Sequence, residues 1–250
     1  MKIVKVSIVS AIAASLLASV ATAGEFSVGV DYSRVEMKGN VQYKGTDIDT
    51  KSTLGITKKK STVIPEIRYT TGDHLFKLNY TGTKFEGTNT LTSAITFNNV
   101  VYAAGTTVNS YIDTDWYVLG YRYNMNPVER LDLALGADLH IVDFEAQIAA
   151  PVANIVEKYD ITFPLPTVAA DIKYNIYDNF NLIASASGMT LGKYGNYKEF
   201  AGGVSIDCKL IDNMMINAGY KSKSFNLKDK SDERFDIKWD GWYAGLAYRF

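Results

Sequence analysis

The chain ends in Gly241-Trp242-Tyr243-Ala244-Gly245-Leu246-Ala247-Tyr248-Arg249-Phe250, and the alternation in this segment is the clearest indication of the fold class. Apolar side chains stand at every second position from Trp242 to Phe250. Successive side chains of a β-strand point to opposite faces, so this alternation predicts a strand with one apolar and one mixed face. The strand closes on an aromatic residue that carries the terminal carboxylate.

The same period-two alternation recurs every 15–25 residues along the chain, and no long segment after residue 23 keeps an apolar period of 3.6. An all-β protein is therefore expected. The ten predicted strands centre on residues 26–33, 62–69, 76–81, 116–123, 131–141, 167–174, 181–187, 200–210, 216–223 and 241–250.

The connections between these strands alternate in length. The short ones carry turn residues: Thr71-Gly72-Asp73, Asn126-Pro127, Asp178-Asn179 and Asp212-Asn213. The longer, polar ones cover residues 38–60, 86–111, 147–158, 192–197 and 226–235. Short turns at one end and long loops at the other are typical of transmembrane barrels with an even number of strands. A hairpin signal at residues 95–102, inside one long loop, leaves eight or twelve strands open as alternatives to ten.

The first 23 residues have the pattern of a cleaved secretory signal. Lys2 and Lys5 precede a short apolar segment, and Ala21-Thr22-Ala23 forms a small-x-small cleavage site. The apolar segment is shorter than the ~20 residues that a membrane-spanning helix needs. We therefore expect an exported protein whose single mature domain is residues 24–250.

Aromatic residues are expected at the two edges of an apolar band. The set near the turns is Phe26, Tyr69, Phe76, Tyr123, Tyr174, Phe180, Tyr248 and Phe250; the set toward the loops is Tyr32, Phe85, Phe144, Phe163, Phe200 and Trp242. A soluble β-sandwich would show the same alternation. The signal, the terminal aromatic and the loop asymmetry favour a transmembrane antiparallel up-and-down β-barrel of about ten strands.

If the apolar face meets lipid, the polar face lines the lumen. Its charged and titratable members form the predicted lumenal network: Asp31, Glu66, Arg68, Lys77, Arg122, Asp132, Asp138, His140, Asp171, Lys173, Asp207, Lys209, Lys221 and Arg249. The two signs nearly balance, and buried charges are tolerated when they are paired. Ten strands enclose little more than the eight-strand case that side chains fill, so a plugged lumen is expected in preference to a wide porin channel.

Composition argues against several other functions. The mature chain has 24 basic residues, after Lys2 and Lys5 leave the total of 26, against 27 acidic ones. No dense basic stripe indicates a nucleic-acid partner. Cys208 is the only cysteine, and with two histidines in the chain we predict neither a metal site nor a cofactor. The acidic set Asp113, Asp115, Asp143 and Glu145 at the loop ends could gather divalent ions, but a hydrated acidic rim is the preferred interpretation.

A catalytic alternative rests on the predicted lumenal face. Asp138 and His140 lie two residues apart on one strand, and Ser185 or Ser187 could complete a hydrolase triad across the barrel. No local motif supports this, so we predict that the protein is not an enzyme.

The chain resembles small outer-membrane β-barrel proteins of Gram-negative bacteria. The residues that carry the resemblance are Ala21-Thr22-Ala23, the strand from Leu131 to Gly136, the Gly202-Gly203 pair and the terminal stretch. It implies an outer-membrane location, contact with membrane lipid and lipopolysaccharide, and an assembly signal at Tyr248 and Phe250 that the barrel-assembly machinery reads by strand addition. The leading prediction is a monomer with a plugged lumen that acts in envelope structure or surface binding. A narrow channel for small solutes is the alternative, followed by a hydrolase built on His140 and an adhesin that uses loop 86–111.

Overall fold

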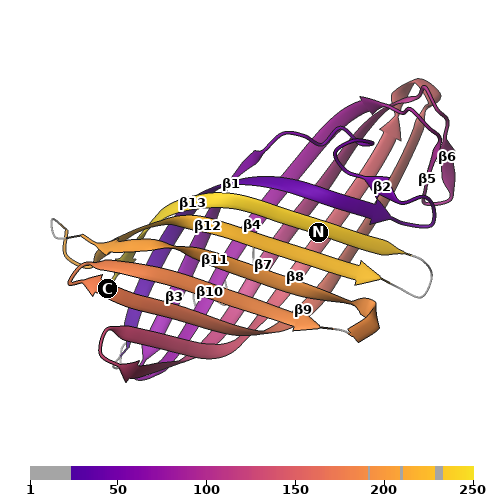
Figure 1. The fold of residues 1–250 in the computed structure, drawn as a ribbon. Helices are drawn as coiled ribbons and strands as arrows, with labels where there is room; N and C mark the ends of the chain where they lie inside the picture. The colour runs from indigo at the N-terminus through magenta and orange to yellow at the C-terminus, as the bar shows by residue number, and fades with distance from the viewer. Residues whose placement is uncertain (1–23, 191, 209–210, 229–232) are drawn as a thin grey trace.

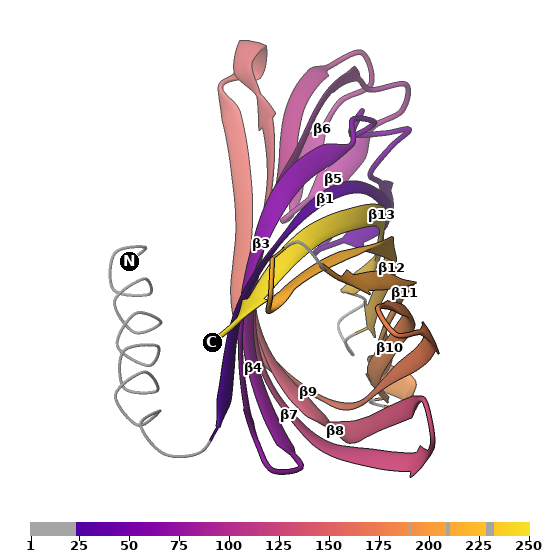
Figure 2. The ribbon, with the colours of Figure 1, turned by 90° about the vertical axis from the view of Figure 1, so that its left-hand side faces the viewer.

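A computed structural model describes residues 24–190, 192–208, 211–228 and 233–250. The predicted signal and Lys209 lie outside these residues. Ten long strands form one closed antiparallel barrel (Figures 1 and 2), which confirms the predicted fold class. They are β1 (Glu25–Gln42), β3 (Lys60–Thr71), β4 (His74–Thr90), β7 (Thr107–Val128), β8 (Leu131–Ala150), β9 (Ile155–Tyr177), β10 (Phe180–Thr190), β11 (Gly195–Asp207), β12 (Met214–Lys228) and β13 (Arg234–Arg249).

The barrel closes where the last strand pairs with the first. β13 runs antiparallel to β1 from Ser27 opposite Arg249 to Gln42 opposite Arg234. The N–H of Phe250 continues the seam by donating to the carbonyl of Phe26 at 2.7 Å. Closure pairs the edge strands with each other, which is the way a sheet satisfies its backbone groups in lipid.

Short elements complete the loop end of the barrel. β2 (Ile48–Asp49) pairs with β1, and β5 (Ile95–Phe97) with β6 (Val100–Tyr102) forms the hairpin whose signal was in the sequence. Two 3₁₀ turns lie in the β8–β9 and β10–β11 connections: η1 (Pro151–Ala153) and η2 (Gly192–Tyr194). In the described ranges, no helix has the length and apolar character to cross a membrane.

Several predicted boundaries are wrong, because strands run further than predicted: β1 to Gln42, β8 to Ala150 and β12 to Lys228. Asn126-Pro127 lies inside β7, and the turn comes later, where Arg130 adopts a positive φ of 70°. The predicted loop 86–111 is mostly strand, because β4 continues to Thr90 and β7 begins at Thr107.

The long strands were underestimated because their apolar residues change faces partway along. In β8 the turn-side residues Leu135, Leu139 and Ile141 point outward, with exposed fractions of 38–47%. The next apolar residues, Val142 and Phe144, have the opposite parity and are buried inside the barrel. The β7–β8 register shows no irregularity at this point. The turn-side half thus presents an apolar surface suited to lipid, and the loop-side half has an internal apolar core like that of a water-soluble protein.

This core corrects part of the predicted aromatic girdle. Phe85 and Phe144 are buried inside the barrel at 0% and 6% exposure, and Phe163 stacks on Phe225. Tyr32 and Trp242 do point outward and pack against each other, with ring centroids 5.6 Å apart. The core fills the loop-side half; its members include Met37, Ile48, Leu54, Phe85, Leu91, Phe97, Tyr102, Ile112, Trp116, Phe144, Ile148, Tyr197, Phe225, Phe235, Ile237 and Trp239.

Candidate functional site: a polar cavity closed at the loop end

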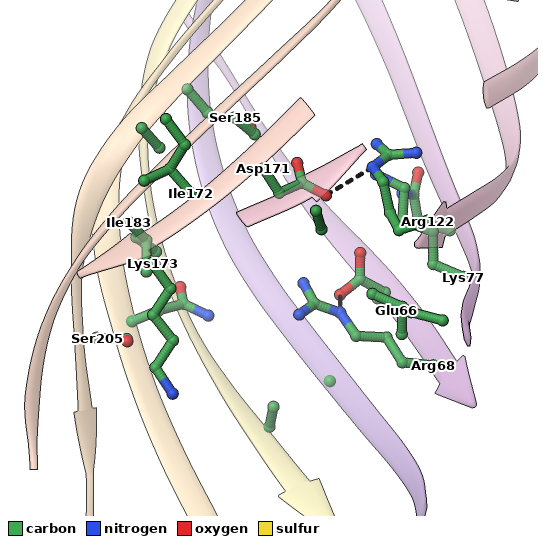
Figure 3. A pocket seen from close by; sticks show the side chains of 18 of the residues that line it. Glu66, Arg68, Lys77, Arg122, Asp171, Ile172, Lys173, Ile183, Ser185 and Ser205 are labelled. Carbon is green, nitrogen blue, oxygen red and sulfur yellow. Dashed lines mark hydrogen bonds and ion pairs between the residues drawn. The ribbon is translucent and has the colours of Figure 1, made fainter. Parts of the chain in front are cut away.

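The turn-side half of the barrel encloses a cavity of about 620 Å³. Residues from all ten long strands line it, together with Gly72 and Asp73 of the β3–β4 turn. Figure 3 shows part of this lining, including Glu66, Arg68 and Lys173. At its other end it reaches His140 and Lys223, which lie directly below the apolar core. The cavity therefore opens toward the turns and ends at the core.

The sequence shapes this cavity by placing small residues on one wall. Ser185, Ala201 and Ser205 lie on β10 and β11, while large charged side chains occupy the opposite wall on β3, β4 and β7. Two glycines make room for charged groups. A Cβ at Gly120 would meet the Asp138 carboxylate at 2.4 Å, and one at Gly245 would overlap the Asp31 carboxylate.

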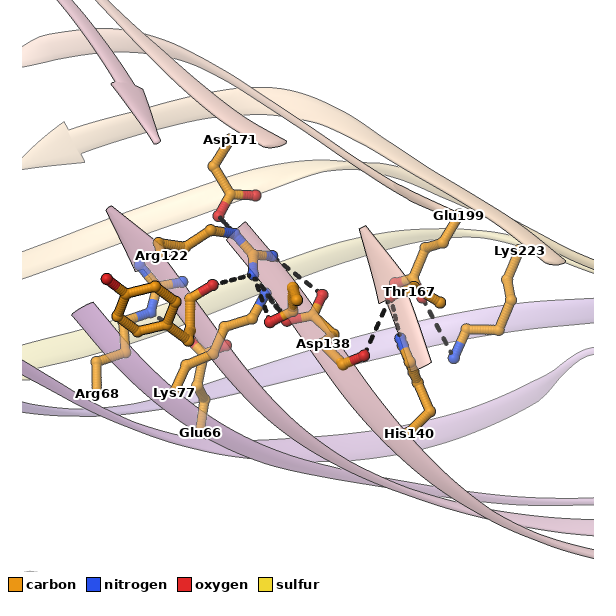
Figure 4. Close-up of polar contacts among 12 residues, drawn as sticks. Glu66, Arg68, Lys77, Arg122, Asp138, His140, Thr167, Asp171, Glu199 and Lys223 are labelled. Atoms are coloured by element: carbon orange, nitrogen blue, oxygen red, sulfur yellow. Dashed lines mark hydrogen bonds and ion pairs between the residues drawn. The ribbon is translucent and has the colours of Figure 1, made fainter. Parts of the chain in front are cut away.

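Arg122 is the centre of the charged wall (Figure 4). Its side chain is 1% exposed and donates two hydrogen bonds to Asp138, at 2.8 and 3.0 Å, and one to Asp171 at 2.7 Å. Lys77 lies 3.7 Å from the same Asp138 carboxylate. The guanidinium also donates to the carbonyl oxygens of Tyr121 and Ala137. A buried charge is tolerated when its hydrogen-bonding groups are engaged in this way.

A second charged cluster lies where the cavity meets the core. Glu199 lies 3.4 Å from Lys221 and 3.6 Å from Lys223, and it accepts a hydrogen bond from the Tyr197 hydroxyl. The ammonium of Lys223 stands 3.9 Å from the centre of the Trp116 ring, a cation–π contact. Glu199 and Lys223 were missed as site residues, although the alternation through Tyr197, Glu199 and Ala201 places Glu199 on the lumenal face.

His140 is buried among aromatic rings at 1% exposure. Its Nε2 lies 3.3 Å from the Thr167 hydroxyl, and Nδ1 has no hydrogen-bond partner among the described residues. The Asp138 carboxylate is held by Arg122 and Lys77. Ser185 and Ser187 line the cavity, but neither hydrogen-bonds to His140. The Ser–His–Asp triad considered as an alternative from the sequence is therefore not formed in the structure.

The cavity brings most of the predicted lumenal network together. Twelve of the fourteen residues line it: Asp31, Glu66, Arg68, Lys77, Arg122, Asp132, Asp138, His140, Asp171, Lys173, Lys221 and Arg249. Asp207 is not part of the lining, and it accepts a hydrogen bond from Arg249 at 3.2 Å. Other pairs are Glu66 with Arg68 at 2.5 Å and Asp132 with Lys173 at 4.0 Å.

The acidic set of the loop ends points away from the lumen. Asp113 lies opposite Glu145, and Asp115 opposite Asp143, on the outer faces of β7 and β8. Tyr80 donates to Asp115 at 2.6 Å, and Thr162 donates to Asp143. Across the part of the chain that the structure describes, no group of three or more His, Cys, Asp or Glu side chains is arranged to hold a metal ion.

Solved structures of outer-membrane β-barrels are similar to this chain in fold. The outer membrane protease OmpT from Escherichia coli is similar, with a TM-score of 0.57, 10% identity, and coverage of 91% of this chain and 96% of that one. Ail, the attachment invasion locus protein of Yersinia pestis, gives a TM-score of 0.39 at 16% identity and covers 92% of this chain and 100% of its own.

These likenesses concern the fold. No family model matches the sequence, and no curated protein matches it. The chain has the fold of Gram-negative outer-membrane β-barrel proteins: ten antiparallel strands, closed, with an outward apolar band on the turn-side half.

Proposed function

We propose that this protein is an integral outer-membrane barrel that does not conduct and that holds a rigid lobe outside the cell, where it acts in envelope structure and surface binding. The apolar band of the turn-side half would lie in the membrane, and the polar cavity would open to the periplasm. The loop-side half, with its own core, would protrude from the outer leaflet.

The observation that carries this proposal is the apolar core above the cavity. Trp116, Tyr197 and Trp239 lie together there, with the Trp116 ring 5.7 Å from Tyr197 and 5.8 Å from Trp239. All three are at most 6% exposed. A hydrated ion would have to shed its water to cross such a layer, and burying an unpaired charge in apolar surroundings costs many kcal/mol.

The loops support a rigid surface lobe. Phe97 and Tyr102 of the β5–β6 hairpin are buried in the core, and the Tyr102 hydroxyl donates to the Ile148 carbonyl at 3.0 Å. Val101, on the outer side of the same hairpin, is 61% exposed. The hairpin is thus held on one face and available to a partner on the other.

Planar-bilayer conductance of the refolded mature protein tests the proposal. A heat-modifiability gel first confirms the folded barrel. We expect no conductance from the wild type and stepwise conductance from the variant Trp116→Ala/Tyr197→Ala/Trp239→Ala, which removes the aromatic layer. The matched control is Trp242→Ala, which removes an aromatic side chain from the outer face and is expected to stay silent.

Stable, reproducible steps from the wild type would overturn the proposal and favour the narrow channel. In that case Arg122 and Asp138 would be expected to set its ion selectivity, because they are the charges at the middle of the lumen.

A further inference from the structure

The strand β9 has a free edge in the loop-side half of the barrel. On one side β9 pairs with β8 without a break from Ile155 to Tyr174. On the other side its pairing with β10 ends at Val168, which lies opposite Gly188. Residues 155–167 therefore have a strand partner on one side only among the described residues, and the β8–β9 hairpin extends beyond β10 in Figures 1 and 2.

A second opening of the barrel wall, between β3 and β4, is covered by the chain itself. The pairing of these two strands ends at Asn79 of β4. Further along β4 the Asn89 side chain donates to the carbonyl oxygens of Ser52 and Thr53, at 2.8 and 3.1 Å. The segment that precedes β3 thus lies against the edge of β4, whereas the edge of β9 is left open.

The hydrogen-bond pattern shows which residues of β9 face this edge. The N–H of Asn175 donates to the carbonyl of Arg130 at the start of β8, so the odd residues of β9 face β8 and the even residues face the other side. Pro164 and Pro166, which have no N–H, stand at even positions, as expected for prolines on a free edge. The even residues of the range 156–162 direct an N–H and a C=O to the edge, and no described residue hydrogen-bonds to them there.

Only part of the free edge can accept another strand. An unpaired edge is a template for strand addition, and proteins commonly protect such edges with proline. Pro164 and Pro166 remove the donors nearest to β10, but residues 156–162 keep theirs. We call residues 156–162 the β9 edge. It lies on the loop side of the outward apolar residues Val168 and Ile172, which are 75% and 44% exposed, so it belongs to the half proposed to protrude from the membrane.

The β9 edge is complementary to itself. An antiparallel copy centred on Tyr159 places Lys158 opposite Asp160 of the second copy, and Asp160 opposite Lys158 of that copy. A shift by two residues in either direction would place Lys158 opposite Lys158, or Asp160 opposite Asp160. Facing like charges destabilise strand pairing, so charge selects the register centred on Tyr159.

The prolines agree with the same register. Pro164 and Pro166 fall opposite residues 154 and 152 of the second copy, and these residues precede Ile155, the first residue of β9. No hydrogen bond of the pairing therefore needs an N–H from either proline.

The surroundings of Asp160 favour a cation from outside the chain. Asp160 lies directly opposite Glu145 of β8, and facing carboxylates repel each other. Lys158 lies 2.9 Å from Glu145, with the two side chains 46% and 32% exposed. A lysine from a second copy would place another positive charge beside this pair of carboxylates.

We propose that the β9 edge pairs with the β9 edge of a second copy of this chain in an opposing membrane. The inference rests on the proposed outer-membrane location. β9 runs from the loop end toward the turns, so an antiparallel copy runs the other way and its barrel is inverted. The pairing forms roughly eight backbone hydrogen bonds, two for each facing pair of even residues. It joins two outer membranes through the loop-side halves of their barrels.

Nanodiscs that each hold one refolded barrel test this pairing. Because each phosphatidylcholine disc contains a single copy, analytical ultracentrifugation distinguishes single discs from pairs joined between two membranes. We expect the wild type to form pairs as the concentration rises. Lys158→Asp and Asp160→Lys each turn two attractive charge pairs into repulsive ones, so each should weaken association about 30-fold, which corresponds to about 2 kcal/mol.

The decisive measurement mixes the two single variants. Discs with Lys158→Asp carry two acidic residues at positions 158 and 160, and discs with Asp160→Lys carry two lysines there. The two kinds of disc should therefore pair with each other, although neither pairs well with itself. The double variant Lys158→Asp/Asp160→Lys restores opposite charges in the same register and should pair with itself like the wild type. Absence of both mixed pairs and double-variant pairs would overturn the proposal.

A backbone variant tests the edge without changing a charge. Thr162→Pro removes one N–H from the β9 edge and should weaken disc pairing, whereas Thr162→Ala should pair like the wild type. The matched charge control is Lys198→Asp, on the exposed outer face of β11, which should also pair like the wild type.

Heat-modifiability gels confirm that all these variants fold. Single discs of the wild type at every concentration, or a loss of pairing in Lys198→Asp equal to that in Lys158→Asp, would overturn the inference. Conductance reports on the proposed function separately: a silent wild-type barrel whose discs stay single rejects this inference alone.

Discussion

The ion pair between Arg122 and Asp138 should dominate the stability of the turn-side half. Their side chains are 1% and 3% exposed, and two hydrogen bonds join them. Asp138→Asn keeps the shape of the side chain but leaves Arg122 with the Asp171 carboxylate as its remaining ion-pair partner. Removing one partner of a buried pair costs about 3–5 kcal/mol. Because Asp171 remains 2.7 Å from Arg122, we expect the lower end, about 3 kcal/mol.

The control is an ion pair of similar geometry on the surface. Arg234 and Asp236 lie 3.0 Å apart with side chains 44% and 41% exposed. Exposed pairs contribute about 0–1 kcal/mol, so Asp236→Asn should change stability by less than 1 kcal/mol. The assay is reversible urea unfolding from lipid vesicles, followed by tryptophan fluorescence and a heat-modifiability gel. An Asp138→Asn effect no larger than that of Asp236→Asn would refute the view that the network is buried and tightly coupled.

Three further predictions concern the loop-side lobe. Phe85→Ala removes a fully buried ring and should lower the free energy of unfolding by about 3–5 kcal/mol, seen as a lower urea midpoint with the barrel still inserted. Burial and the nearby Glu157 carboxylate raise the pKa of Tyr102 from 10.0 to about 12. The folded state therefore favours the protonated hydroxyl. The resulting stabilisation is fully present below pH 10 and is lost as the pH rises through 12. Tyr102→Phe should remove this decrease of the unfolding midpoint at alkaline pH. Burial raises the pKa of Asp49, but hydrogen bonds from Ser52 and from the Lys51 N–H lower it more, so the net pKa lies below 3.8. The stabilisation of the folded state by the ionised Asp49 carboxylate is present above pH 3.8 and is lost as the pH falls further. The difference in unfolding free energy between wild type and Asp49→Asn should therefore shrink below pH 4 in unfolding curves.

The barrel could be predicted because its turn-side half obeys one simple rule. Along Leu135, Leu139 and Ile141 the apolar residues keep one parity, and all three point outward. The same rule, applied to Asp138 and Asp171, placed charged residues on the lumenal face. Pairing details such as the double hydrogen bond from Arg122 depend on side-chain rotamers and on neighbouring strands, which period-two alternation does not specify.

The loop-side half was harder to predict because its apolar side chains point into the barrel, whereas those of the turn-side half point outward. Phe85 and Phe144 were assigned to an outward girdle, but they point into the barrel and belong to the apolar core of the loop-side half. The change of parity also hid the upper parts of β4 and β7, which were taken for a loop. Glu199 was missed because the predicted strand began at residue 200, whereas β11 begins at Gly195.

The change of apolar face within β8 has a consequence for how accurately this strand can pair during assembly. A one-residue slip of β8 would turn Asp138 toward lipid and, at the same time, turn Val142 and Phe144 toward water. A one-residue slip of β8 is therefore unfavourable in both halves of the strand, because it exposes a charge on the apolar outer surface of one half and removes apolar side chains from the core of the other. A single residue inserted between Ile141 and Val142 would reverse the parity of Val142 and Phe144. The apolar side chains of β8 would then face outward along the whole strand, and the core of the loop-side half would lose its β8 residues.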